Sequence, residues 1–220
     1  IQMIFITGDT HGDWKNRFKP ECFPIGQSLN RSDYVIVCGD FGYWHDTDIE
    51  RNNLDWLESQ PWTTLFVDGN HSNFDRLKKL SVEESHDISD GILETDDPRI
   101  AEWQYDYCKM FRINHISWWQ EELPSQKEMD EGIENLVKYG NKVDYIITHC
   151  PPTKTLDVMN MSRGFFDKLK SDRLTDYLQE IQENIQYKGW YCGHMHENNC
   201  YKDDITVLYH NIIEIGGDAQ

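Results

Sequence analysis

Positive charge is scarce in this chain of 220 residues, which has 21 lysine and arginine residues against 39 aspartate and glutamate residues. The formal net charge is −18 at pH 7 with histidine neutral. Non-specific binding of nucleic acid depends on neutralising phosphates with lysine and arginine, so this composition disfavours it. The only evident basic cluster is Arg76-Leu77-Lys78-Lys79, which falls short of the basic stripe expected of a nuclease that acts on long nucleic acids.

Long apolar runs, paired cysteines and flexible linkers are also missing from the sequence. No stretch is long enough to span a membrane, and no N-terminal segment resembles a signal peptide. The six cysteines show no Cys-x-x-Cys spacing, so we expect them to be reduced and structural, in a cytoplasmic protein. With no internal repeat and no Pro/Gly/Ser-rich linker, we expect residues 1–220 to form a single domain.

What the sequence does contain is five short apolar runs, each followed by a group rich in Gly, Asp, Asn or His. Runs of this length are typical of buried strands, and helical patterns lie between them, which favours an α/β fold. Ligands of an open α/β sheet bind beyond the carboxyl ends of its strands, so we expect these groups to converge on one rim. The five groups are Gly8-Asp9-Thr10-His11-Gly12-Asp13, Gly39-Asp40-Phe41-Gly42, Gly69-Asn70-His71, His149-Cys150-Pro151-Pro152 and Gly193-His194-Met195-His196.

Helices are expected where apolar residues recur at helical spacing, and two further strands are expected near the end of the chain. Ser125 and Glu128 have the spacing of a capping box at the start of one helix. We expect strands at residues 206–209 and 211–215 to pair around a tight turn. The expected helices cover residues 14–18, 49–58, 73–80, 125–140 and 174–185.

Residues 81–124 combine acidic turns with a cluster of aromatic residues. We expect a packed insert whose aromatic side chains complete the core. The alternative is a cap that covers the site and selects substrate, because aromatic side chains can also stack on a nucleobase. The aromatic residues concerned are Trp103, Tyr105, Tyr107, Phe111, Trp118 and Trp119.

Oxygen donors beside nitrogen donors suit a divalent metal such as zinc, manganese or iron. Two metals about 3.5–4 Å apart that share a bridging carboxylate can clamp a phosphate ester and activate a hydroxide for in-line attack. We predict that Asp40 is this bridge. The other predicted ligands are Asp9, His11 and His196 for the first metal, and Asn70, His149 and His194 for the second.

His71 follows a predicted ligand directly but need not bind metal itself. Its ring could protonate the leaving alkoxide or stabilise charge on the phosphoryl oxygens, so we predict that His71 is the catalytic residue. Four other histidines have no motif around them, and we expect them to be surface residues or satisfied core residues. These are His45, His86, His115 and His210.

The five groups, in this order along the chain, resemble the motifs of the calcineurin-like metallophosphoesterase superfamily. The resemblance implies a metallophosphoesterase-type double β-sheet sandwich flanked by helices, with four layers in the order αββα. It also implies a dinuclear centre of manganese, iron or zinc, with the ligand roles given above. The segments 33–40 and 114–119 further resemble a bacterial and phage branch of this superfamily.

Three departures from the motifs of the superfamily bear on function. Ser72 stands where members usually carry an acidic residue, and the stretch after Leu80 is shorter than in relatives of the branch. Phe41-Gly42-Tyr43 replaces the Asp-Arg-Gly of protein phosphatases, which argues against a protein Ser/Thr phosphatase. Asp68 or Asp75 is the hypothetical partner that orients the predicted catalytic histidine in its place.

We therefore expect a metal-dependent hydrolase of a phosphomonoester or phosphodiester that acts through a metal-bridging hydroxide. Small substrates such as nucleotides or cyclic nucleotides suit the acidic composition better than long duplexes do. A nuclease acting on nucleic-acid phosphodiesters is the nearest alternative. A non-catalytic protein-binding scaffold that retains the metal site is a more distant one.

Overall fold

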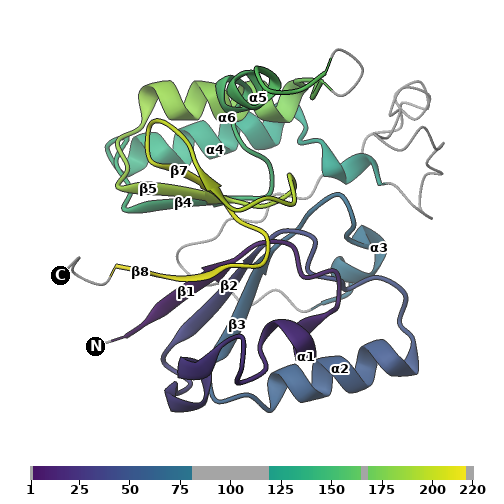
Figure 1. The fold of residues 1–220 in the computed structure, drawn as a ribbon. Helices are drawn as coiled ribbons and strands as arrows, with labels where there is room; N and C mark the ends of the chain where they lie inside the picture. Colours follow the sequence, from purple (N-terminus) through teal and green to yellow (C-terminus); the bar gives the residue numbers. More distant parts are fainter. Residues whose placement is uncertain (1, 81–118, 165–167, 217–220) are drawn as a thin grey trace. The chain divides into compact units, whose positions relative to one another are not determined.

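The computed structural model of this chain describes residues 2–80, 119–164 and 168–216 (Figure 1). The chain divides into two compact units. The prediction of a single domain stays a prediction. Most of the predicted insert or cap at residues 81–124 lies outside the described residues, because the structure does not describe residues 81–118. The first unit comprises Ile1–Ser72, Tyr145–Cys150 and Gly189–Gln220, and the second comprises Asn73–Asp144 and Pro151–Lys188.

The first unit contains a four-stranded sheet with the strand order β3-β2-β1-β8 (Figure 1). Strands β1, β2 and β3 run parallel, and β8 runs antiparallel to β1. In this register Ile6 of β1 lies between Ile36 of β2 and Ile213 of β8, so apolar residues pair across the sheet. The bounds are Ile4–Thr7 for β1, Tyr34–Cys38 for β2, Thr63–Val67 for β3 and Ile212–Ile215 for β8.

A second four-stranded sheet of the same unit has the order β4-β5-β7-β6 (Figure 1). Strands β4, β5 and β7 run parallel, and the short β6 runs antiparallel to β7. The sequence predicted each of these strands except β6, whose two exposed residues show no apolar pattern. The bounds are Tyr145–Thr148 for β4, Gly189–Cys192 for β5, Asn199–Cys200 for β6 and Ile205–Val207 for β7.

The predicted pairing of the last two strands is wrong, because β7 and β8 belong to different sheets. The N–H of Leu208, just after β7, donates to the carbonyl oxygen of Cys192 at 2.8 Å. The side-chain oxygen of Asn198 then accepts from the N–H groups of Tyr209 and Asn211, at 2.9 and 3.0 Å. These bonds replace a tight turn with a connection that carries the chain from one sheet to the other.

The two sheets pack face to face through an apolar core. Along β2 the side chains alternate, because successive residues of a strand point to opposite faces. Ile36 and Cys38 lie in the core between the sheets, whereas Val35 and Val37 lie in a core that also contains Trp14. This arrangement confirms the predicted α/β class with a double β-sheet sandwich.

Three helical segments of the first unit lie along the outer face of its first sheet (Figure 1). Helix α2 starts after Thr47, whose hydroxyl accepts from the N–H of Glu50 at 3.2 Å. A hydroxyl at this position satisfies one of the free N–H groups of the first turn. The segments are α1 (Trp14–Arg17), the 3-10 helix η1 (Pro24–Ser28) and α2 (Asp48–Glu58).

Among its described residues, the second unit contains four α-helices and one 3-10 helix. The hydroxyl of Ser125 accepts from the N–H of Glu128 at 3.3 Å, and the carboxylate of Glu128 accepts from the N–H of Ser125 at 2.6 Å, which confirms the predicted capping box. Across the described ranges, no helix has the length and apolar character needed to cross a membrane. The elements are α3 (Phe74–Leu77), η2 (Gln120–Glu122), α4 (Gln126–Lys138), α5 (Thr153–Asn160) and α6 (Arg173–Asn184), of which α5 and η2 were not predicted.

The cysteines of the described residues are free thiols, as the absence of paired spacings predicted. Burial raises the pKa of the Cys38 and Cys192 thiols well above its ordinary value. A thiol that stays protonated is a poor nucleophile, so these two cysteines act as small apolar core residues.

Candidate metal centre

The structure places all eight predicted site residues in the first unit, where they follow the carboxyl ends of five parallel strands. Three of these strands belong to the first sheet and two to the second. The expected rim is therefore formed by the edges of two facing sheets rather than by one. The residues are Asp9 and His11 after β1, Asp40 after β2, Asn70 and His71 after β3, His149 after β4, and His194 and His196 after β5.

Backbone hydrogen bonds join the loops that carry these residues. The N–H of His11 donates to the carbonyl oxygen of Asp40 at 2.8 Å, and the N–H of Gly193 donates to that of His149 at 3.0 Å. The carboxylate of Asp9 accepts from the N–H of the residue that follows Gly193, at 3.0 and 3.1 Å to its two oxygens. The protein backbone thus holds the motif loops against one another.

Two glycines make this close packing possible. A Cβ atom at Gly193 would lie 2.1 Å from Asp9 Oδ1, and one at Gly69 would lie 2.3 Å from Asp40 Oδ1. Both distances are far inside van der Waals contact, so any other residue at these positions would displace a carboxylate. The glycine of one motif therefore leaves room for the carboxylate of another.

Four of the predicted ligands have a left-handed backbone conformation, which is unfavourable for residues that carry a Cβ atom. The φ angles are +46° at His11, +41° at Asp40, +65° at His194 and +51° at His196. Such strain persists only where the surrounding structure enforces it, and it gathers at functional sites. Its presence at these four positions supports a functional role for them.

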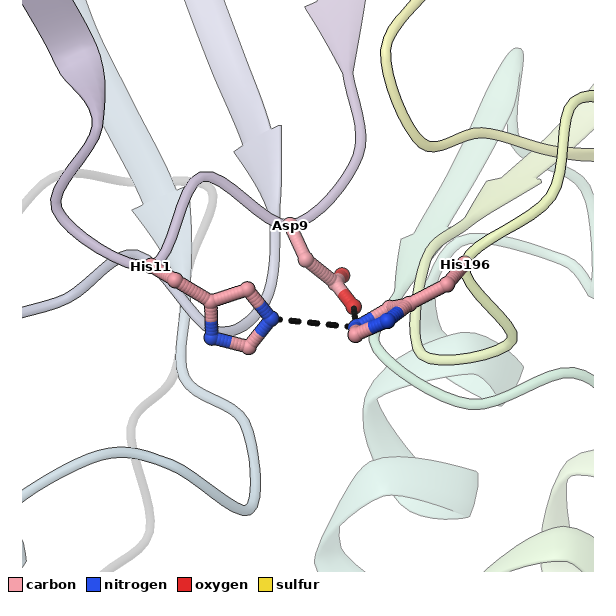
Figure 2. Close-up of side chains that lie close together, drawn as sticks. All are labelled: Asp9, His11 and His196. Atoms are coloured by element: carbon pink, nitrogen blue, oxygen red, sulfur yellow. Dashed lines mark hydrogen bonds and ion pairs between the residues drawn. The ribbon is translucent and has the colours of Figure 1, made fainter.

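The first group of candidate ligands consists of Asp9, His11 and His196 (Figure 2). The Nε2 atoms of His11 and His196 lie 3.0 Å apart, and the latter lies 3.1 Å from Asp9 Oδ2. Donor atoms at about 2.0–2.2 Å from a shared metal lie roughly 3–3.5 Å from one another. The spacing of these three atoms is therefore compatible with one coordination shell.

The second group surrounds the Nε2 atom of His149. This atom lies 2.9 Å from Asn70 Oδ1, 3.1 Å from His194 Nδ1 and 3.5 Å from Asp40 Oδ1. The other ring nitrogen, Nδ1, lies 3.2 Å from the carbonyl oxygen of Cys38. A carbonyl oxygen only accepts hydrogen bonds, so Nδ1 carries the hydrogen. When the ring is neutral, the lone pair of Nε2 then points toward the other three candidate ligand atoms. All four residues predicted around the second metal thus lie together.

Asp40 lies between the two groups and is 2% exposed. Its Oδ2 is 4.0 Å from His11 Nε2, whereas its Oδ1 is 3.5 Å from His149 Nε2. One oxygen toward each group is the orientation that a bridging carboxylate requires. Asp9, Asp40 and His149 also form a cluster of close donor atoms, but the nitrogen that His149 turns toward Asp9, at 3.7 Å, is the one that carries the hydrogen.

Burial and neighbouring charges determine the protonation of the site. Burial raises the pKa of Asp9, but the hydrogen bond with His196 and the positive charge of His149 outweigh it, so the pKa lies below its ordinary value. Burial and the charge of His149 lower the pKa of His194 to about 4. Asp9 and His194 therefore favour the forms that bind metal ions, an ionised carboxylate and a neutral imidazole. Burial lowers the pKa of His149, but the charges of Asp40 and Asp9 outweigh it and raise the pKa above its ordinary value, so a metal ion that binds His149 would displace a proton.

The donor set fits a pair of divalent metal ions. Imidazole nitrogens combined with carboxylate oxygens suit zinc, manganese and iron, and Asn70 adds a neutral oxygen. Asp9 and Asp40 are almost completely buried, at 1% and 2% exposed. Two buried carboxylates need compensating positive charge close by, which divalent cations would supply.

The ring of His71 is exposed and lies beside the first group. Its centroid is 5.4 Å from that of His11 and 5.4 Å from that of Trp44. The hypothesis that Asp68 orients this ring stays a prediction. The other hypothetical partner, Asp75, belongs to the second unit.

Three residues near the site escaped prediction from the sequence: Arg17, Trp44 and Tyr209. The buried guanidinium of Arg17 donates to the carbonyl oxygen of Asp9 at 2.9 Å and to that of Tyr209. The ring of Tyr209 stacks on that of His196, and Trp44 contacts His71 as described above. Only Arg17 had a signal in the sequence: it lies three positions after Trp14, a spacing that places both residues on one face of a helix. In the structure this face is buried.

Comparison with known proteins identifies the family. The sequence model of the calcineurin-like phosphoesterases matches residues 3–198, and the chain belongs to this family. The resemblance based on the five motifs is thus confirmed. Members of the family are metal-dependent phosphoester hydrolases with a dinuclear centre.

Two individual proteins show how far the similarity extends. Human synaptojanin-2 is 27% identical over 146 residues, which make up 62% of this chain and only 9% of that protein. The solved structure of phosphopantetheinyl hydrolase from Mycobacterium tuberculosis matches with a TM-score of 0.50 and 13% identity, covering 100% of this chain and 97% of that chain. At this identity the second likeness shows the fold alone.

Proposed function

We propose that this protein hydrolyses small phosphate esters, either monoesters or diesters, at a centre of two divalent metal ions. The observation that carries the proposal is the position of Asp40, whose two carboxylate oxygens face two separate groups of donor atoms. Membership of the calcineurin-like phosphoesterase family supports the same chemistry. Manganese, iron and zinc are the metals we propose, because the donors mix imidazole with carboxylate.

Each ion would be held by four side chains, with one shared between them. When bound, the ions would polarise the phosphoryl oxygens as Lewis acids and lower the pKa of water. Hydrogen bonds within the chain orient two of the proposed ligands. The carbonyl oxygen of Cys38 orients the ring of His149, and the N–H of His194 orients the carboxylate of Asp9. The proposed ligands are Asp9, His11, Asp40 and His196 for one ion, and Asp40, Asn70, His149 and His194 for the other.

His71 is the residue that we propose as the general acid. Its ring is exposed, while its N–H donates to Asp40 Oδ1 at 2.8 Å and so anchors the residue beside the shared carboxylate. From this position the ring can donate a proton to the leaving oxygen of an ester. An alkoxide leaving group needs that proton, whereas p-nitrophenolate departs readily without it.

Small esters, nucleotides among them, are the substrates that the composition favours. A net charge of −18 disfavours long polyanions, whereas one phosphate group can be held by the metal ions. We also propose a cytoplasmic location, because the cysteines of the described residues are free thiols.

The proposal is tested with purified protein that is stripped of metal and reloaded with Mn²⁺, Fe²⁺ or Zn²⁺, then assayed on phosphomonoesters and phosphodiesters. Asp40→Asn is expected to lower kcat/KM at least about 100-fold and to weaken binding of both ions. Asp157→Asn, which changes an exposed carboxylate of α5, is the matched control and should keep wild-type activity. Hydrolysis of neither ester class with any metal would overturn the proposal, and full activity of Asp40→Asn would overturn the bridging role.

The role of His71 has a separate test based on the leaving group. His71→Gln is expected to slow hydrolysis of alkyl phosphate esters by about 100-fold or more, because general acid catalysis contributes that much. Hydrolysis of p-nitrophenyl esters should fall far less. An equal loss on both kinds of ester would remove the general-acid assignment while leaving the metal centre intact.

A further inference from the structure

The side chain of Arg17 joins two segments of the first unit that are far apart in the sequence. Arg17 ends helix α1 and is 9% exposed. Its guanidinium donates to Thr7 Oγ1 at the end of β1, at 2.7 Å, and to the carbonyl oxygen of Asp9 just beyond that strand, at 2.9 Å. It also donates to the carbonyl oxygen of Tyr209, in the connection between β7 and β8. One planar group with several donors therefore holds the two segments against each other.

The two segments pack closely where Arg17 joins them. A Cβ atom at Gly8 would lie 2.0 Å from the carbonyl oxygen of Leu208 and 2.7 Å from the Cα atom of Tyr209. Such close packing leaves little room for water, so a buried carbonyl oxygen at this contact needs a donor from the protein. The guanidinium of Arg17 is a donor that serves both sides of the contact.

Each of the two segments determines the position of a candidate ligand in the first group. Asp9 is itself such a ligand, and Arg17 holds its main chain. Tyr209 is not a ligand, but its ring stacks on that of His196. The guanidinium carbon of Arg17 lies over the ring of Tyr209, 5.7 Å from its centroid, which adds a cation–π contact. Arg17 thus reaches two of the three ligands of the first group, one through its backbone and one through a stacked ring.

The second group of candidate ligands has a different support. His149 is 7% exposed, and its Nδ1 atom is held by the carbonyl oxygen of Cys38. The side chains of His11 and His196, in the first group, are 34% and 47% exposed. Because exposed rings are less restricted by packing, the first group depends more on groups that orient its ligands. Loss of Arg17 should therefore affect the first group more than the second.

We propose that Arg17 is a positioning residue for the first metal ion, and that it raises the affinity of this site without contacting the ion. The inference rests on the proposed function, because it takes the two groups of donor atoms as two metal sites. Within the described part of the chain, the guanidinium donates to carbonyl oxygens, a hydroxyl and a ring nitrogen, and to no carboxylate. The carboxylate oxygens of Asp9 thus stay available to a metal ion.

The charge of Arg17 and its hydrogen bonds have opposite effects on metal affinity. A positive charge close to the site repels a divalent cation, whereas the hydrogen bonds hold the ligands in place. Arg17→Lys separates the two effects, because lysine keeps the charge but lacks the planar fork. We expect the affinity for the first ion to fall about 10- to 100-fold in this variant, and the affinity for the second ion to change by less than about threefold.

The test titrates the metal-free chain with Mn²⁺ by calorimetry and records electron paramagnetic resonance spectra of the loaded protein. The wild type is expected to bind two ions that are magnetically coupled. Arg17→Lys, at Mn²⁺ concentrations that fill only the tighter site, should instead show the signal of an isolated ion. Two reference variants identify the site that is lost: His196→Gln removes a ligand of the first group only, and Asn70→Ala removes one of the second. The profile of Arg17→Lys should match that of His196→Gln.

Arg31→Lys is the matched control for a structural effect of the substitution. Arg31 also donates to two backbone carbonyl oxygens, those of Glu58 and Trp62, but it precedes β2, whereas Asp40 follows that strand. Its substitution should lower the stability to urea and leave the binding of both ions unchanged. Tyr209→Ala is a second variant for the case that Arg17→Lys does not fold. It removes the ring through which Arg17 reaches the first group, so the same ion should be lost.

The outcomes separate this inference from the proposed function. Unchanged binding of both ions in the variants of Arg17 and Tyr209, an equal loss of both ions, or the same loss in Arg31→Lys overturns the positioning role. Ester hydrolysis by the wild type then leaves the phosphoesterase standing. If the wild type binds two ions but hydrolyses no ester, the proposed function fails, and selective loss of the first ion in Arg17→Lys still supports the inference. A wild type that binds fewer than two ions overturns both.

Discussion

The ring of Tyr209 lies flat against the ring of His196, with centroids 4.5 Å apart and planes 9° from parallel. The side chain of Asn198 holds this pair in place, because it follows His196 closely in sequence and accepts from the N–H of Tyr209 at 2.9 Å. The side chain of His196 is 47% exposed and would otherwise have wide freedom to rotate. Stacking thus presents its Nε2 atom to Asp9 in one orientation.

Removing the stacked ring should weaken metal binding at the first group of ligands. Tyr209→Ala leaves His196 free to rotate, and we expect metal affinity to fall about 10- to 100-fold, which is typical when a group that orients a ligand is lost. Tyr209→Phe keeps the ring and should bind metal within a few-fold of wild type. Metal affinity is measured by competition with a chelator for Mn²⁺ or Zn²⁺. If the Phe and Ala variants bind metal equally well, the ring of Tyr209 does not orient His196 for metal binding.

Arg17 should be important for stability as well as for the site. Its guanidinium is buried and donates to Thr7 Oγ1 at 2.7 Å and to the carbonyl oxygens of Asp9 and Tyr209. Arg17→Met keeps the length of the side chain but leaves these buried oxygens without their donor. We expect the free energy of unfolding to fall by about 2–4 kcal/mol, measured by urea denaturation of metal-free protein.

Arg17→Lys is the matched variant for this prediction. A lysine keeps the charge but lacks the planar fork that reaches several acceptors at once, so we expect an intermediate loss of stability. Substituting the exposed Arg173 by methionine should change the stability by less than about 0.5 kcal/mol. The prediction is wrong if Arg17→Met is as stable as the wild type.

The strands and the predicted ligands were accessible from the sequence because both depend on local patterns. Strand β2 is apolar throughout, since Val35 and Val37 enter one core while Ile36 and Cys38 enter the other. Such a run is visible without knowledge of the fold. The predicted ligands directly follow these strands, so a strand-end position combined with residue type was sufficient to predict that they lie together.

Two of the residues that escaped prediction, Arg17 and Tyr209, interact over a long separation in the chain. Arg17 and Tyr209 are 192 residues apart, and no local pattern relates them. Tyr209 was expected to end a strand that pairs with the next one, but the connection crosses between sheets, which places its ring on His196. Trp44 lies in a loop whose conformation depends on Glu50, six residues further along the chain, and hydrogen bonds from backbone N–H groups to a side-chain carboxylate leave no periodic signature in the sequence.

A single methyl group at Gly193 should disturb the site more than the fold. A Cβ atom there would lie 2.1 Å from Asp9 Oδ1 and 2.5 Å from the carbonyl oxygen of Cys38. Gly193→Ala must therefore displace the carboxylate of Asp9, and we expect metal affinity to fall at least about 10-fold. Overpacking should also lower the free energy of unfolding by about 1–3 kcal/mol.

Gly140→Ala is the control for this substitution. Gly140 has a φ of +70° but open space where its Cβ atom would be, so alanine adds backbone strain without a clash. We expect a loss of roughly 1 kcal/mol in stability and unchanged metal affinity. If calorimetry finds normal metal binding in Gly193→Ala, the close approach to Asp9 has no functional consequence.

Asp33 connects the starts of the first two strands and should make stability depend on acid pH. It is completely buried, and its carboxylate accepts from the N–H of Met3 at 2.8 Å and from the N–H and side-chain amide of Asn30 at 2.9 and 2.7 Å. The hydrogen bonds from the Met3 and Asn30 N–H groups lower the pKa of Asp33 below its ordinary value of about 3.9.

A carboxylate with a lowered pKa in the folded state stabilises the fold at every pH above its ordinary pKa, and this contribution is lost as pH falls through the lowered value. Asp33→Asn removes the ionisable group and directs an amide N–H at a donor, so we expect it to be less stable than wild type at pH 7. The stability difference between the two proteins, from urea denaturation, should stay constant from pH 7 to about pH 5. It should then shrink below about pH 4, because the wild-type carboxylate becomes protonated. A difference that persists unchanged at low pH, or that grows there, would show that the charge of Asp33 is not what holds the two strands together.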